Sequence, residues 1–170
     1  PDRLKNFRLD TLGGFQLLAL HRIGLEAQEG IDLMREHGVP QFTVDSHRPL
    51  GAFDLLGVSF STELGYTNML TAIDLAGIAL HAVDRELDEP FVVAGGHAAF
   101  NPEPIADFID IAILGDGEEA VIALTEILVQ WKAEGRPGGR EEFLIRLART
   151  GGFYIPRFYD VEYLEDSRIR

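Results

Sequence analysis

FVVAGGH, residues 91–97, is the stretch that decides the fold of this chain. Its four leading apolar residues are too few for a helix and do not alternate with polar ones. Such a run is typical of a strand buried on both faces, as in a parallel sheet. The glycines that follow allow a tight turn and a close approach by another backbone or by a ligand.

Similar apolar runs lie on both sides of this stretch, separated by segments with helical periodicity. Buried strands are predicted over residues 53–61 (FDLLGVSFS) and 109–114 (IDIAIL), and shorter extended segments over residues 41–45, 78–81 and 153–161. Helices are expected over residues 15–23, 25–37, 62–77, 103–108, 118–133 and 141–149. This alternation predicts an α/β fold of the flavodoxin-like (Rossmann-like) class, an open, mostly parallel sheet with helices on both faces.

Length and composition are those of one globular domain. The chain has 170 residues, 46% hydrophobic and 25% charged, and we expect one domain over residues 1–150 followed by an extended tail over residues 151–170. No apolar run reaches the ~20 residues of a membrane helix, and no basic-then-apolar leader opens the chain. We therefore expect a soluble, cytoplasmic protein without a membrane partner.

Charge and cysteine content exclude several functions. The net charge of -13 makes the domain a poor partner for nucleic acid, because phosphate binding relies on Lys and Arg. With 0 cysteines, the chain can hold neither a disulfide nor a thiolate-bound iron-sulfur cluster. The spacing of its histidines and carboxylates matches no metal motif, and no Gly-x-Ser-x-Gly nucleophile motif is present.

Three loops are candidates for ligand binding because ligands of open α/β sheets bind beyond the carboxyl ends of the strands. The candidate residues are Ser59, Phe60, Ser61, Gly95, Gly96, His97, Ala98, Gly115, Asp116 and Gly117. The alternative is that each loop is only a tight turn between a strand and a helix. Glu118 and Glu119 oppose an anion at the third loop, which is also not a dinucleotide fingerprint.

These loops resemble a known family. Residues 93–104 (VAGGHAAFNPEP), residues 113–119 (ILGDGEE) and the strand end at residues 57–61 (GVSFS) are similar to the cobalamin-binding domains that precede radical S-adenosylmethionine (SAM) domains. Residues 37–40, 46–50, 63–68 and 153–160 resemble one branch of this group, putative Fe-S oxidoreductases. The resemblance covers about residues 38–170. The strand that opens such domains is not recognisable before residue 38.

The resemblance implies a cobalamin-binding-type domain over residues 1–150, whose tail leads to a radical SAM domain of the same polypeptide. That domain, absent here, would carry the [4Fe-4S] cluster and S-adenosylmethionine, so this chain alone is not expected to be catalytic. Cobalamin-binding histidines occur in an Asp-x-His-x-x-Gly motif, and Asp45-Ser46-His47 matches only its start, with Leu50 at the glycine position. The resemblance therefore implies cobalamin without a histidine ligand to cobalt.

Two other functions stay open. The domain could be a cofactor-free docking or structural module of the same enzyme, which the missing ligand histidine favours. It could also be a separate phosphate or flavin binder, against which the acidic residues of the third loop count.

Overall fold

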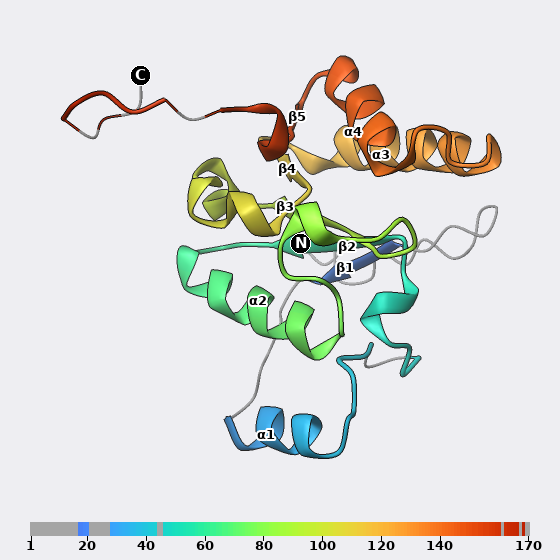
Figure 1. Cartoon of the computed structure of the whole chain (residues 1–170), viewed down its shortest axis with the longest axis vertical. Helices are drawn as coiled ribbons and strands as arrows, with labels where there is room; N and C mark the ends of the chain where they lie inside the picture. The colour runs from blue at the N-terminus through green and yellow to red at the C-terminus, as the bar shows by residue number, and fades with distance from the viewer. Residues whose placement is uncertain (1–16, 21–27, 44–45, 161, 167, 169–170) are drawn as a thin grey trace.

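A five-stranded sheet forms the centre of the domain (Figure 1). The computed structural model describes residues 17–20, 28–43, 46–160, 162–166 and 168. The strands lie side by side in chain order: β1 (Leu17–Leu20), β2 (Leu55–Ser59), β3 (Phe91–Gly95), β4 (Ile111–Ile113) and β5 (Phe153–Tyr154). The first four are parallel, and β5 pairs with β4 in the antiparallel direction.

Four α-helices and several 3₁₀ helices surround the sheet. The α-helices are α1 (Gln28–Glu36), α2 (Tyr66–Leu75), α3 (Gly117–Ala133) and α4 (Gly139–Thr150). The 3₁₀ helices cover Leu50–Ala52, Glu63–Gly65, Ala82–Asp84, His97–Phe100, Glu103–Phe108 and Pro156–Phe158. The predicted α/β, flavodoxin-like fold with a mostly parallel sheet is confirmed.

Each face of the sheet has its own hydrophobic core, because successive residues of a strand point to opposite faces. Val92 and Ala94 of β3 pack with α2 and with the 3₁₀ helices that follow β3. Phe91 and Val93 pack with α3 and α4, where Trp131 is fully buried. The apolar run of residues 91–94 therefore has no solvent-facing side, which explains why its sequence shows no alternation.

The prediction of a helix over residues 15–23 was wrong. Residues Leu17–Leu20 form β1, paired in parallel with β2 from Leu17↔Leu55 onward. A short apolar run has no periodicity that separates strand from helix, so pairing with β2 decides its conformation. The opening strand that the family resemblance required is thus present. Residues 21–27, which follow it, lie outside the described part of the chain.

Two short predicted strands are also absent. Of residues 41–45, Phe42 makes only an isolated bridge to Pro49, and residues 44–45 are outside the described part. Residues 78–81 do not form a strand, because their backbone N–H and carbonyl groups are hydrogen-bonded to side chains. Ala79 N donates to Glu89 Oε1 at 2.7 Å, and the carbonyls of Ala79 and Leu80 accept from Arg85.

The C-terminal segment joins the sheet only briefly. Of residues 153–161, Phe153–Tyr154 form β5, and a 3₁₀ helix begins at Pro156. Beyond it the chain extends away from the body of the domain (Figure 1). The division into a domain over residues 1–150 and a tail over residues 151–170 stays a prediction.

A buried carboxylate joins the segments at the amino edge of the sheet, where β3 and β4 begin. Asp110 Oδ2 accepts from Arg85 Nη1 at 2.6 Å and from the backbone N–H of Val92 at 2.8 Å. Asp110 Oδ1 accepts from Arg140 Nη2 at 2.9 Å. The side chains of Arg85 and Asp110 are 0% and 1% exposed, so water does not screen this ion pair.

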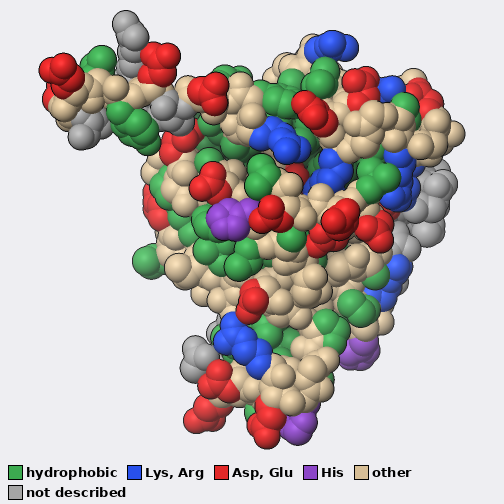
Figure 2. All heavy atoms as spheres, in the orientation of Figure 1, with side chains coloured by type: hydrophobic (Ala, Val, Ile, Leu, Met, Phe, Trp, Pro, Cys, Tyr) green, Lys and Arg blue, Asp and Glu red, His purple; other side chains and the backbone are tan. Residues whose placement is uncertain are grey.

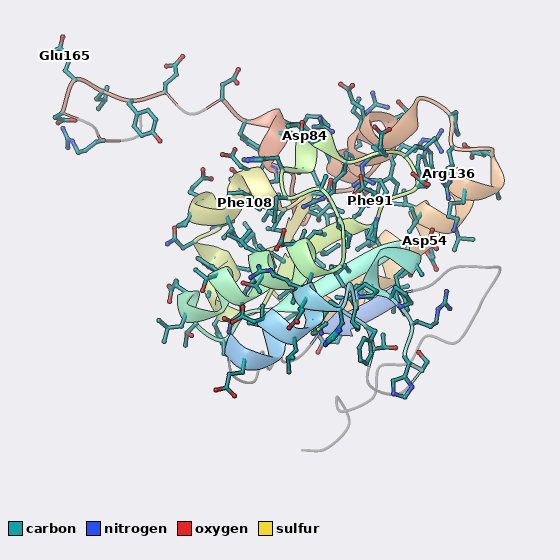
Figure 3. All side chains as sticks on the ribbon, turned by 60° about the horizontal axis from the view of Figure 1, so that its bottom comes forward. Asp54, Asp84, Phe91, Phe108, Arg136 and Glu165 are labelled. Carbon is teal, nitrogen blue, oxygen red and sulfur yellow. The ribbon has the colours of Figure 1, made fainter. Side chains whose placement is uncertain are left out.

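The two arginines also donate hydrogen bonds to backbone carbonyls in and beside the loop of residues 79–89. Arg85 donates to the carbonyls of Ala79, Leu80 and Phe108, and Arg140 to those of Glu86, Glu89 and Pro90. Asp84 and Phe108, labelled in Figure 3, lie on the two segments that Arg85 connects. Burial lowers the pKa of Arg85, and Asp110 opposes this shift. The network fixes the amino edge without a regular strand over residues 78–81.

Replacing Asp110 by Asn is expected to destabilise the domain strongly, because two buried guanidinium groups lose their counter-charge. We expect a loss of about 3–5 kcal/mol in the free energy of unfolding, measured with urea. Asp74→Asn is the matched control. It removes an exposed ion pair between Arg35 and Asp74, whose side chains are 49% and 50% exposed. The free energy of unfolding should therefore fall by less than about 1 kcal/mol. Equal losses in the two variants would contradict this role of Asp110.

Tyr154 of β5 gives a pH-dependent prediction. Burial, followed by its hydrogen bond to Glu103, raises the pKa of Tyr154 to about 12. The folded state therefore holds this proton more tightly than the unfolded chain, in which a tyrosine titrates near ~10. The stabilisation is complete below pH ~10 and is lost as the pH rises through about 12. When phenolate absorbance is recorded as the pH is raised, Tyr154→Phe should lack the tyrosine titration step that the wild-type chain shows at the highest pH. Loss of a step near ~10 instead would contradict the assignment.

Candidate functional site

The three candidate loops lie at one edge of the sheet, as the sequence predicted. β2, β3 and β4 are neighbours and parallel, so their carboxyl ends share an edge. Ser59 pairs with Gly95 at the ends of β2 and β3, and residues 114–117 follow β4 on the other side of β3. We call this edge the carboxyl rim.

The loops after β2 and β3 are bonded directly to each other. Phe60 N donates to the carbonyl of Gly95 at 2.8 Å, and Ala98 N donates to the carbonyl of Phe60 at 3.1 Å. Gly96, at φ +88°, lies against this junction. A Cβ there would stand 2.6 Å from the Phe60 oxygen and 3.1 Å from Ser59 Oγ. Packing between the two loops therefore demands glycine at position 96, with no ligand required.

Three other glycines of the rim face open space. Within the described part of the chain, no atom beyond the neighbouring residues lies within 4 Å of the position that a Cβ would take at Gly95, Gly115 or Gly117. Gly115 needs glycine for its φ of +127°, but Gly95 and Gly117 have no such backbone requirement. Neither packing nor conformation explains glycine at these two positions. Their small size leaves the rim accessible to a flat ligand.

The remaining predicted residues divide into exposed and buried ones. The side chains of Ser59, Ser61, His97 and Asp116 are exposed, so they can reach a ligand above the rim. Phe60 and Ala98 are buried, at 3% and 6% exposed. The buried pair supports the loops through backbone hydrogen bonds instead of presenting side chains.

Tyr66 is a residue of the rim that is not among the candidate residues predicted from the sequence. Its hydroxyl donates to the carbonyl of Ala98 at 2.8 Å and to that of Asn101 at 3.0 Å. Its ring meets the Phe60 ring edge to face, with centroids 5.0 Å apart. Its position in the stretch ELGYTN (63–68), directly after the serine-rich loop, is the sequence signal that could have identified it.

The three described loops of the rim carry negatively charged side chains and no Lys or Arg. Residues 57–67, 93–104 and 113–123 contain no Lys or Arg. Glu63, Asp116, Glu118 and Glu119 are exposed there, and the last two lie in the first turn of α3. They neutralise the positive end of that helix and repel a phosphate. Figure 2 shows acidic side chains spread among hydrophobic ones over the face that it presents.

Each rim loop also exposes one large apolar side chain. These are Leu64 at 85%, Phe100 at 64% and Leu114 at 40% exposed. Leu114 directly precedes Gly115, and the other two lie in the loops after β2 and β3, so a ligand or a covering domain at the rim would meet both small and apolar residues.

The described residues provide no metal site. Among them, no group of three or more His, Cys, Asp or Glu side chains could hold a metal ion. His47 packs on Phe42 in the turn that precedes β2, and therefore lies toward the amino edge. Within the same residues, no helix combines the length and apolarity needed to cross a membrane.

Comparison with known proteins identifies the family. The family described as "Radical SAM proteins, N-terminal" matches residues 12–156, most of the chain, including all three rim loops. No curated protein and no solved structure matches the chain. The chain therefore belongs to the family of N-terminal domains of radical SAM proteins.

Proposed function

We propose that this domain binds cobalamin on its carboxyl rim and presents it to the cluster-bearing part of a radical SAM enzyme. The observation that carries the proposal is the lack of any described residue, beyond the chain neighbours, within 4 Å of a Cβ at Gly95 or Gly117, where the backbone conformation does not demand glycine either. A planar ring can approach the backbone most closely at such positions. Cobalamin, when bound, would supply a cobalt centre for methyl or electron transfer.

The polar groups of the rim suit the edge of a corrin ring. Ser59 and Ser61 expose hydroxyl groups, which can donate to and accept from the amide side chains of cobalamin. His47 lies toward the opposite edge, so the proposed mode places no histidine of the Asp45-Ser46-His47 segment on cobalt. The exposed apolar side chains Leu64, Phe100 and Leu114 would be covered by the ligand or by the catalytic domain.

The iron-sulfur chemistry is assigned to another part of the polypeptide. The chain has 0 cysteines and cannot hold a [4Fe-4S] cluster by thiolates. The cluster and S-adenosylmethionine would belong to the radical SAM domain, the proposed partner of this rim.

The alternative is a docking module without a cofactor. The direct bonding between the β2 and β3 loops favours it, because Phe60 and Gly96 hold these loops together without any ligand. A phosphate or flavin binder is disfavoured, since Glu118 and Glu119 occupy the first turn of α3.

Gly95→Ala tests the proposal because the new methyl group enters open space and should disturb only a bound ligand. We expect the wild-type chain to bind hydroxocobalamin and Gly95→Ala to bind it about tenfold more weakly, by visible absorbance titration. Its stability to urea should be unchanged or slightly higher. FMN, whose phosphate would meet the acidic rim, should not bind.

Gly30→Ala is the matched control. Gly30 lies in α1, and no other described part of the chain comes within 4 Å of its Cβ position, so the same change should leave the affinity for hydroxocobalamin unaltered. Failure of the wild-type chain to bind hydroxocobalamin would favour the docking module. If Gly95→Ala binds hydroxocobalamin as tightly as the wild-type chain does, the ligand does not bind at Gly95.

A further inference from the structure

The junction of the β2 and β3 loops is built around the Phe60 residue. Its backbone makes hydrogen bonds with Gly95 and Ala98, and its ring is buried between Tyr66 and Gly65. A Cβ at Gly65 would stand only 3.1 Å from the Phe60 ring, so this glycine makes room for the ring. The ring thus fixes Ser59 and Ser61, the two residues on either side of it.

Tyr66 holds the other half of the junction. It begins α2, and its hydroxyl reaches across to two carbonyls of the β3 loop, those of Ala98 and Asn101. Ala98 lies within the 3₁₀ helix His97–Phe100 and Asn101 directly follows it, and this helix carries the exposed His97 and Phe100 side chains. One phenol therefore connects α2 with the loop that presents both side chains.

The hydroxyl of Tyr66 stays a donor at neutral pH. Burial raises its pKa above the ordinary tyrosine value, and the nearby charge of Glu63 adds to the shift. A phenol that remains protonated has one proton to share between the two carbonyls, and an unpaired buried carbonyl would be costly.

We propose that Tyr66 is the positioning residue of the ligand site: with Phe60 it fixes the β2 and β3 loops in the arrangement that a ligand on the carboxyl rim requires. The inference rests on the proposed function for the identity of the ligand. The contacts by which Tyr66 and Phe60 fix the β2 and β3 loops, which we call the clamp, lie entirely within the chain. Tyr66 does not touch the ligand in this account, because it lies beneath the loop, 8% exposed.

Tyr66→Phe removes the hydroxyl and keeps the ring that packs on Phe60. We expect it to weaken hydroxocobalamin binding about tenfold and to speed amide exchange at Ala98 and Asn101, whose N–H groups donate within the junction. Tyr159→Phe is the matched substitution at an exposed tyrosine and should change neither property. Val129→Ala destabilises the opposite face of the sheet and should leave affinity within twofold.

The two measurements separate this inference from the proposed function. If the wild-type chain binds hydroxocobalamin and Tyr66→Phe binds it as well as Val129→Ala does, Tyr66 has only a structural role and the inference is wrong. If the wild-type chain does not bind hydroxocobalamin, the proposed function is wrong. The amide exchange rates of Tyr66→Phe then test the clamp alone. Faster exchange confined to residues 96–101 would support it, and unchanged exchange would overturn it.

Discussion

The buried carboxylate of Asp110 is the interaction on which the arrangement of this domain depends. It joins α4, the loop of residues 79–89 and the start of β3 through two arginines and one backbone amide. All of these groups lie at the amino edge of the sheet. Because these interactions stabilise the domain at its amino edge, the glycines and exposed apolar side chains at the opposite edge need not contribute to the stability of the fold.

At the carboxyl rim the same chain combines rigidity with open space. Phe60, Gly96 and Tyr66 bind the β2 and β3 loops together, while Gly95, Gly115 and Gly117 leave space above them. Two glycines adjacent in sequence therefore have different reasons to be glycine. Gly96 is required by the backbone of Phe60, whereas no contact of a described residue accounts for glycine at position 95.

The sequence predicted the parts that depend on local pattern. Residues 91–94 and α3 carry unambiguous apolar patterns, and the parallel order of the strands brought the three loops to one edge. The strand Leu17–Leu20 was missed because four apolar residues fit a helix equally well until β2 pairs with them. Asp110 was passed over because its partners lie 25 and 30 residues away. Such distant contacts leave no periodic signal, although a charged residue inside an apolar run is itself a warning.

The location of the ligand is the central claim, and amide chemical shifts of the isotope-labelled chain test it most directly. On addition of hydroxocobalamin, the account predicts the largest shift changes at Gly95, Gly115 and Gly117, where no described residue beyond the chain neighbours comes within 4 Å of a Cβ position. Residues 79–89 at the amino edge should remain unchanged. Shift changes centred on residues 79–89, or spread evenly over the domain, would contradict the account.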